Sequence, residues 1–197
     1  MNHYFLENPD LETLERNLAL EIFHTKFRFI THNGLFSCTE IDDASVTLIK
    51  SLPPLTGTLL DLGCGYGVLG IVLAKTYPIE VTMADINRTA LTYAGKNAKL
   101  NQVHATTIHS DSFANISGTF DNIVLNPPIH AGKEVMYRMY EESAQHINPG
   151  GALYVVILKK HGAESTLKKL NALFSHVNIL YKKKGCYVFQ ANKKAAH

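Results

Sequence analysis

Two groups of residues in this sequence combine the side chains and the spacing that group-transfer chemistry needs. The first is the stretch 61–67, D-L-G-C-G-Y-G, an acid followed by three glycines spaced two apart, directly after an apolar run. Such glycines suit a turn with positive φ, where a ligand approaches the backbone without meeting a Cβ. The second is Asn126-Pro127-Pro128, which follows the apolar run 120–125. Because proline cannot continue a central strand, the chain must leave the sheet there.

The glycine spacing alone leaves the ligand open. Gly65, Gly67 and Gly70 also fit G-x-G-x-x-G, and Asp85 lies 20 positions after Gly65, as in dinucleotide-binding proteins. Asp61 favours another ligand, because a carboxylate repels a pyrophosphate but attracts the cationic methionine end of S-adenosylmethionine. The pattern D-x-G-x-G-x-G resembles the first motif of methyltransferases that use this cofactor. The resemblance implies a cofactor site that includes Asp61 and the turn residues Gly63, Cys64, Gly65 and Gly67.

Further acids follow the next expected strands. Asp85 ends the apolar run 81–84, where it could accept hydrogen bonds from ribose hydroxyls, and Asp111 ends the run 105–110, where it could accept the adenine amino group. Each acid alone is also a common cap or turn residue. Their shared place at strand ends, where doubly wound sheets bind ligands, favours the cofactor. Two apolar side chains, Ile86 and Phe113, could sandwich the adenine. We also expect Ser112, which follows Asp111, to belong to the cofactor site.

The Asn126-Pro127-Pro128 motif fits methyl transfer to an exocyclic amine. The lone pair of such an amine is delocalised into its ring, so the amine is a poor nucleophile. Hydrogen bonds from its two hydrogens to the Asn126 side-chain oxygen and to the Pro127 carbonyl would draw the nitrogen towards sp3 and aim its lone pair. We expect Asn126, Pro127 and Pro128 to be the catalytic residues, with Asn126 also at the cofactor. The motif resembles the signature of amino-group methyltransferases acting on adenine, cytosine or guanine.

The hydrophobic pattern predicts the elements that position these residues. Apolar runs that end in an acid, an asparagine or a turn predict strands, and longer amphipathic stretches between them predict helices. The last two runs, 177–181 and 186–190, are joined by K-K-K-G and predict an antiparallel hairpin. The fold class is therefore α/β, with a mostly parallel sheet that closes with this hairpin. This arrangement resembles the Rossmann-like fold of class I methyltransferases, which implies a seven-stranded sheet. Between Pro54 and Phe174 we expect strands at 58–62, 81–85, 105–110, 120–125 and 152–158, and helices from 68 to about 77, 87–101, 134–147 and 163–174.

The residues before this core predict an N-terminal extension. Residues 9–17 could form a short helix, and the alternation from 18 to 30 predicts a β-hairpin that turns around His24-Thr25-Lys26. A helix capped at Asp42 or Asp43 follows. We expect a single domain over 1–197, with an extension at 1–50 and a Rossmann-like core at 51–197.

Composition excludes several classes of protein. The three cysteines are far apart and form no C-x-x-C pair, and no histidines have metal-ligand spacing, so we expect no metal and a reducing cytoplasm. No apolar run approaches the ~20 residues of a membrane span, and the N-terminus has no secretion signal.

The charge is uneven: from Lys159 onward there are nine lysines and one acid. A basic segment of this kind suits a polyanionic partner, although it is more often a solvated face.

The motifs together resemble the catalytic domain of the ribosomal RNA small-subunit methyltransferase C family. The matching stretches are G-L-F-S at 34–37, the acid-rich turn at 40–45, D-L-G-C-G-Y-G, N-P-P-I-H-A-G-K and K-K-K-G-C-Y-V. The resemblance covers nearly the whole chain and implies S-adenosylmethionine-dependent methylation of a guanine N2 in small-subunit ribosomal RNA. It also implies that Phe36 and Ile129 lie near the target base. We expect RNA contacts from the basic segment: Lys159, Lys160, Lys182, Lys183 and Lys184.

Two departures from the family pattern leave alternatives open. Ile129 stands where many amino methyltransferases have an aromatic residue that stacks on the flipped base. The chain also lacks the second methyltransferase-like domain found in front of enterobacterial members, so docking would fall to the hairpin, the lysines or a second subunit, in a monomer or a homodimer. Other acceptors remain open: DNA adenine, a protein glutamine or a small molecule. An NAD-dependent oxidoreductase and a non-catalytic RNA-binding module are the alternatives from other classes.

Overall fold

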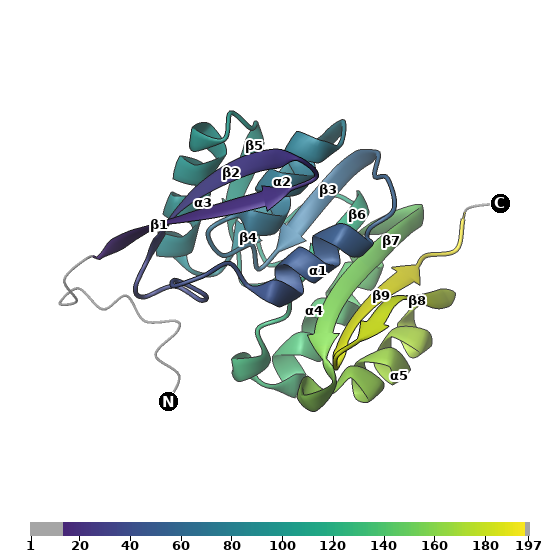
Figure 1. The fold of residues 1–197 in the computed structure, drawn as a ribbon. Helices are drawn as coiled ribbons and strands as arrows, with labels where there is room; N and C mark the ends of the chain where they lie inside the picture. The colour runs from purple at the N-terminus through teal and green to yellow at the C-terminus, as the bar shows by residue number, and fades with distance from the viewer. Residues whose placement is uncertain (1–13, 196–197) are drawn as a thin grey trace.

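Short apolar runs form one seven-stranded sheet in the computed structural model, which describes residues 14–195 (Figure 1). Its strand order is β5-β4-β3-β6-β7-β9-β8, with β3 to β7 parallel and β9 antiparallel to both β7 and β8. The predicted fold, a mostly parallel sheet closed by an antiparallel hairpin, is confirmed. The strands of this sheet are β3 Gly57–Leu62, β4 Ile79–Asp85, β5 Ala105–His109, β6 Phe120–Leu125, β7 Ile147–Leu158, β8 His176–Lys183 and β9 Cys186–Asn192.

Helices cover both faces of the sheet because successive strand residues point to opposite sides. Leu59 belongs to the core cluster that contains α1, α2 and α3, whereas Leu60 belongs to the cluster that contains α4 and α5. Both leucines are completely buried. Asp42 caps α1 and Asn87 caps α3, as predicted, by accepting backbone N–H bonds from the first turns. The helices are α1 Asp43–Ser51, α2 Val68–Thr76, α3 Arg88–Leu100, α4 Lys133–His146 and α5 Ala163–Leu173, with short 3-10 turns η2 Ile129–Ala131 and η3 Lys159–His161.

The predicted N-terminal hairpin is present as β1 (Glu15–Ile22) and β2 (Thr25–His32). Its turn is Phe23-His24, one residue earlier than expected, and both residues have positive φ (52° and 58°), as a two-residue hairpin turn requires. The helix expected at 9–17 lies mostly outside the described residues. Its described end is strand, because β1 from Glu15 onward pairs with β2.

The hairpin packs on the core through its buried Ile22, Phe27 and Phe29, and a buried asparagine of α3 bonds its backbone. Asn97 in α3 accepts the Ile30 N–H (2.7 Å) and donates to the Ile30 carbonyl (2.9 Å) and the Tyr66 carbonyl (2.9 Å). In Figure 1 the hairpin lies over the side of the sheet that α2 and α3 cover. The amide thus holds the extension against the segment that follows β3.

Strand β7 begins at Ile147, five residues before the predicted start, so Pro149 and Gly150 lie inside it. The reason is Gly151, where a Cβ would lie 2.5 Å from the Asp121 carbonyl oxygen. Only glycine lets the two backbones approach so closely, and this allows β7 to pair with β6 from Ile147. No helix in the part of the chain described is long and apolar enough to cross a membrane.

Candidate functional site

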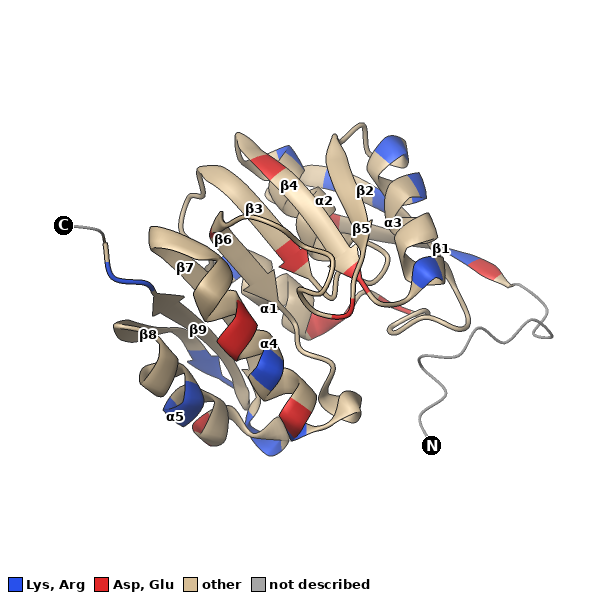
Figure 2. Ribbon diagram, turned by 180° about the vertical axis from the view of Figure 1, so that it is seen from behind, with Lys and Arg blue, Asp and Glu red and all other residues tan. Residues whose placement is uncertain are grey.

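The order of the strands reverses between β3 and β6, where ligands bind in doubly wound sheets. The chain leaves β3 through the glycine turn and leaves β6 through Asn126-Pro127-Pro128, so both predicted motifs flank this point. Asp85 ends the neighbouring β4. Figure 2 shows acidic segments at the ends of the central strands and basic segments on α5 and the β8–β9 hairpin.

The glycine turn has the predicted left-handed backbone. Gly63, Gly65 and Gly67 have φ of 72°, 55° and 95°, which a residue with a Cβ adopts only with strain. The Gly63 and Cys64 N–H groups both donate to the Ala84 carbonyl, at 2.8 and 2.9 Å. Nothing lies within 4 Å of a Cβ built on Gly65, so the turn is open on that side. The Cys64 side chain is buried, and burial raises the pKa of its thiol.

Asp61 organises the step from this turn into α2. Its Oδ2 accepts the Gly70 N–H at 2.8 Å, whereas its buried Oδ1 has no hydrogen-bond partner among the described residues. The side chain is completely buried. Burial raises its pKa to about 7, and the charge of Asp85 adds to the effect. Asp61 would therefore place a buried negative charge and an unpaired oxygen beneath the turn.

Asp85 braces the glycine turn from the end of β4. One carboxylate oxygen accepts the Gly65 N–H and the other the Asn87 N–H, both at 2.8 Å. Burial raises the pKa of Asp85, although these backbone hydrogen bonds oppose the shift. The carboxylate is partly exposed and its oxygens keep lone pairs, so it can also accept ribose hydroxyls. The neighbouring Ile86 side chain is 40% exposed.

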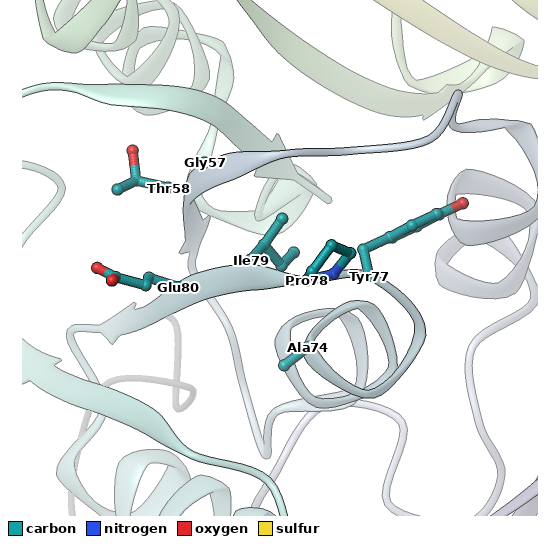
Figure 3. Close-up of a pocket in the computed structure, with 7 residues that line it drawn as sticks. All are labelled: Gly57, Thr58, Ala74, Tyr77, Pro78, Ile79 and Glu80. Atoms are coloured by element: carbon teal, nitrogen blue, oxygen red, sulfur yellow. The ribbon is translucent and has the colours of Figure 1, made fainter.

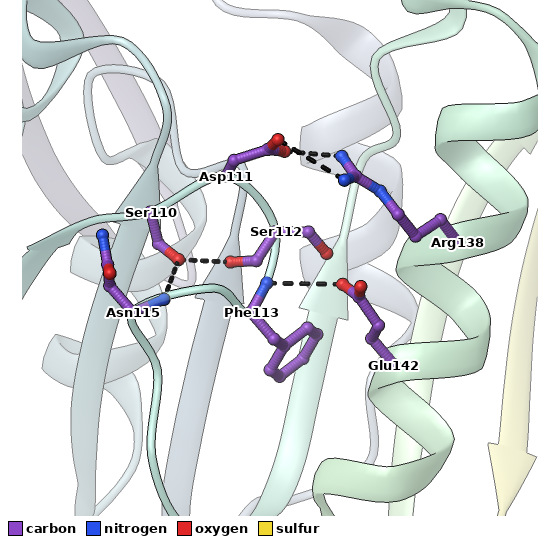
Figure 4. Close-up of polar contacts among 7 residues, drawn as sticks. All are labelled: Ser110, Asp111, Ser112, Phe113, Asn115, Arg138 and Glu142. Atoms are coloured by element: carbon purple, nitrogen blue, oxygen red, sulfur yellow. Dashed lines mark hydrogen bonds and ion pairs between the residues drawn. The ribbon is translucent and has the colours of Figure 1, made fainter.

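The segment after β5 differs in part from the expectation (Figure 4). Asp111, expected at the adenine amino group, forms an ion pair with Arg138 of α4, at 2.5 Å. The Phe113 ring is only 6% exposed and stacks on His146, with ring centroids 4.4 Å apart. In this conformation the ring is buried against α4, and its expected place at the adenine stays a prediction. Ser112 has positive φ, and its Oγ is buried without a partner among the described residues.

The Asn126 side chain has a fixed orientation. Its amide nitrogen donates to Asp42 Oδ2 (2.9 Å) and to Ser45 Oγ (3.0 Å). The Asn126 Oδ1 and the Pro127 carbonyl receive no hydrogen bond from any described residue. These are the two acceptors that the sequence predicts for an amine substrate. The contacts with Asp42 and Ser45 were missed, because 84 and 81 residues separate the partners and no periodic signal links them.

The predicted substrate-binding residues divide into two places. Phe36 is 50% exposed, and the next carbonyl, of Ser37, accepts the Tyr66 hydroxyl at 3.2 Å, so this segment lies against the glycine turn. Ile129 begins η2 and is partly buried against the α4 side of the core. Both therefore belong to segments that adjoin the two motifs.

The five predicted lysines are all exposed and meet at one edge. The Lys159 N–H donates to the Gly185 carbonyl at 2.7 Å, which joins η3 to the β8–β9 turn that carries Lys182–Lys184. Leu158 pairs with Cys186, so this turn lies at the carboxyl end of β7, the same edge as Asn126. Burial first and the charge of Asp42 second raise the pKa of Cys186, which places the start of β9 near the Asn126 network.

Sequence comparison identifies the family. The family model described as "Methyltransferase small domain" matches residues 26–190. The chain belongs to the methyltransferase small domain family. As a member of it, the chain is an S-adenosylmethionine-dependent methyltransferase, and the ambiguity of the glycine spacing is resolved in favour of this cofactor.

Several relatives share this domain. An uncharacterized protein of Bacillus subtilis is 38% identical over 97% of the chain and 98% of its own length. Ribosomal RNA small subunit methyltransferase C of Vibrio cholerae is 34% identical over 93% of the chain. The solved 16S rRNA N2 G1207 methyltransferase of Thermus thermophilus, in complex with AdoMet and guanosine, has a TM-score of 0.84 and 28% identity over 96% of the chain. The chain spans about half of the latter two relatives, 55% and 53% of their lengths.

The site fits the family's cofactor. Two buried polar atoms, Asp61 Oδ1 and Ser112 Oγ, lack partners among the described residues, and the turn is open at Gly65. Buried polar atoms are normally paired, so unpaired ones at strand ends suit a polar ligand. Asp61 would attract the cationic methionine end, Asp85 would hold the ribose, and Ile86 would cover one face of the adenine. Within residues 14–195 no group of three or more histidines, cysteines and acids could hold a metal ion.

A hollow of about 470 Å³ lies at the other edge of the sheet (Figure 3). It is lined at the amino ends of β3 and β4, by residues that include Thr58, Tyr77 and Glu80. Ligands of this fold bind at the carboxyl ends instead. The residues that line the hollow do not form a catalytic or metal-binding group, so we assign it no part in the site.

Proposed function

We propose that this chain methylates the exocyclic N2 amino group of a guanine in small-subunit ribosomal RNA. The observation that carries the proposal is the fixed Asn126 amide, whose Oδ1 and the neighbouring Pro127 carbonyl are two unused acceptors beside the cofactor turn. Similarity to the Thermus thermophilus enzyme, named for the N2 position of G1207, supports the choice of base. Such a substrate also agrees with the cytoplasmic location that the cysteine pattern predicts.

The two acceptors match the chemistry of the amine. When Asn126 Oδ1 and the Pro127 carbonyl accept its two hydrogens, the N2 lone pair is taken out of conjugation with the ring and directed at the incoming methyl. S-adenosylmethionine, when bound, would supply a methyl group on a sulfonium and would leave as a neutral thioether. The methylated nitrogen then releases a proton to water. The site needs no strong base, because the cationic nitrogen is acidic.

The lysine edge is the proposed docking surface for the RNA. Lys159, Lys160 and Lys182–Lys184 are exposed at the same edge of the sheet as Asn126. Phosphate contacts position a nucleic acid without reading its sequence, so these lysines would hold the strand while Asn126 and Pro127 receive the base. Phe36 offers an exposed ring near the cofactor turn and would supply the stacking that Ile129 cannot.

The test is methyl transfer from labelled S-adenosylmethionine to ribosomal RNA taken from a strain that lacks this gene. We expect N2-methylguanosine after nuclease digestion and mass spectrometry. Asn126→Ala should keep its cofactor affinity and lose roughly 10²-fold or more in turnover, because the residue orients the nucleophile. Asn171→Ala, which removes an exposed asparagine of α5, is the matched control.

Two results would overturn the proposal. If the label appears on another base or on protein, the methyl acceptor is not a guanine N2. Normal turnover by Asn126→Ala would reduce the Asn126-Pro127-Pro128 motif to a bend that ends β6.

A further inference from the structure

Asp42 has more hydrogen bonds than a helix cap needs. Its Oδ2 accepts the Ser45 N–H at 2.8 Å, which caps α1, and also the Ser45 hydroxyl at 3.1 Å and the Asn126 side-chain amide at 2.9 Å. Ser45 is buried, and its Oγ accepts the second Asn126 amide hydrogen at 3.0 Å. Both hydrogens of the Asn126 amide are therefore held by α1.

This network fixes which way the Asn126 amide faces. A carboxylate has no hydrogen to donate, so a turned amide would place its oxygen against the Asp42 carboxylate and lose that hydrogen bond. The Ser45 hydroxyl could donate to the turned oxygen only by giving up its own hydrogen bond to Asp42. The nitrogen must face α1, and Oδ1 must face away from it. Sequence does not decide this, because an isolated asparagine after a strand turns freely between both orientations.

The same network makes Oδ1 a better acceptor. Hydrogen bonds in series polarise one another, so an amide that donates to a carboxylate carries more negative charge on its oxygen. The amine nitrogen becomes positive as it takes the methyl, and preorganised dipoles directed at developing charge stabilise the transition state. The Asp42 carboxylate adds a negative charge behind the amide that faces the substrate.

We propose that Asp42 and Ser45 are positioning residues for the methyl transfer, which hold Asn126 with its oxygen turned to the substrate amine. The inference rests on the proposed role of Asn126. It gives the acid-rich turn at 40–45 a function in the reaction beyond capping α1, and it makes the N-terminal extension part of the catalytic apparatus.

The test separates capping from positioning. Serine is as good a helix cap as aspartate but is too short to reach Asn126, so Asp42→Ser keeps the cap and removes the contact. Asp42→Asn keeps the cap and the contact, because its side-chain oxygen can accept from Asn126. Asp43→Asn removes an exposed acid from the first turn of the same helix and is the control. Ser45→Ala removes the second acceptor and leaves the Asp42 carboxylate in place.

With labelled S-adenosylmethionine and in vitro transcribed small-subunit ribosomal RNA, Asp42→Ser should lose about tenfold or more in kcat, because misplacing a reacting geometry has costs of this order. Ser45→Ala should lose less. Asp42→Asn should fall between the parent and Asp42→Ser, because it keeps the acceptor for Asn126 and removes the negative charge, and Asp43→Asn should equal the parent. Calorimetric affinity for S-adenosylmethionine and the melting temperature should not change. In the Asn126→Ala background, Asp42→Ser should have no further effect.

Losses that multiply in the double variant, or a lower cofactor affinity or melting temperature in Asp42→Ser, would overturn the inference. If Asn126→Ala itself turns over normally, the proposed function fails, and the orientation is decided separately by nuclear magnetic resonance. The Asn126 side-chain amide signal, identified by its loss in Asn126→Ala, should exchange with solvent faster in Asp42→Ser than in the parent. Equal exchange rates would refute the hydrogen-bond network as well.

Discussion

Replacing Asp61 by asparagine should stabilise the fold while it weakens cofactor binding. Burial raises the pKa of Asp61 from 3.8 to about 7, so the ionised form is disfavoured in the folded chain. Each tenfold change in acidity corresponds to about 1.4 kcal/mol, so the charge costs on the order of 4 kcal/mol once it is fully formed. Asparagine keeps an oxygen for the Gly70 N–H and never ionises.

The sign of the pH dependence follows from which state holds the proton. Between pH 4 and 7 the folded chain keeps a proton on Asp61 that the unfolded chain has lost, so stability falls as pH rises and levels off above about 7. Urea unfolding at pH 4.5, 6 and 8 should therefore show Asp61→Asn gaining stability over the parent as pH rises. Asp43→Asn, which removes an exposed acid, should follow the parent at every pH.

Cofactor affinity should change with pH in the opposite direction to stability. The cationic methionine end favours the ionised carboxylate, so S-adenosylmethionine affinity of the parent should rise with pH towards 7, and Asp61→Asn should lose this dependence. A stability difference between Asp61→Asn and the parent that is the same at every pH would refute the reasoning. Unchanged affinity in the variant would show that the charge has no part in binding.

Three further predictions follow from hydrogen bonds and charges described above. Asp85→Ala should weaken S-adenosylmethionine binding by about 1.5–3 kcal/mol in calorimetry, the range for hydrogen bonds to a charged group, and unchanged affinity would remove Asp85 from the ribose site. Changing Lys182–Lys184 to serine should weaken RNA binding and flatten its salt dependence, since each phosphate contact contributes a slope of about −0.7 for single strands. An equal salt slope in parent and variant would make the turn a solvated face. The control variant removes three exposed lysines near the amino ends of the strands: Lys26, Lys75 and Lys99. Asn97→Ala should lower the free energy of unfolding by about 1–3 kcal/mol in urea, because backbone groups of Ile30 and Tyr66 lose their partner, and an unchanged midpoint would contradict this.

Local signals predicted the elements because each is encoded by neighbouring residues. The strand ends at Asp85 and Asn126, the cap at Asp42 and the lysine hairpin were all predicted from apolar runs and the polar or turn residues that end them. The start of β7 was not predicted, because Pro149 and Gly150 indicate a turn. Only the close approach of the chain to β6 at Gly151 lets the strand begin before them.

Contacts between distant segments account for what sequence could not predict. The Phe113 ring was expected at the ligand, but its direction depends on His146 in α4, 33 residues away. The sequence did not predict the partner of Asp111, because only the fold brings Arg138 of α4 to it. Exposed pairs of this kind contribute only about 0–1 kcal/mol, so a ligand could displace the arginine at little cost. The Asp42–Asn126 contact likewise exists only once α1 packs on the sheet, over β7.

The way Asn97 holds the hairpin has a consequence for how this chain can vary. Asn97 binds the backbone of Ile30 and not its side chain, so it is indifferent to the hairpin's sequence and strict about its register. Hairpins that keep the buried Ile22, Phe27 and Phe29 could therefore differ in their exposed residues with the asparagine left in place, whereas a one-residue insertion in β2 would break the joint. The extension is in this sense an exchangeable part, whose outer surface is free to diverge while its attachment stays the same.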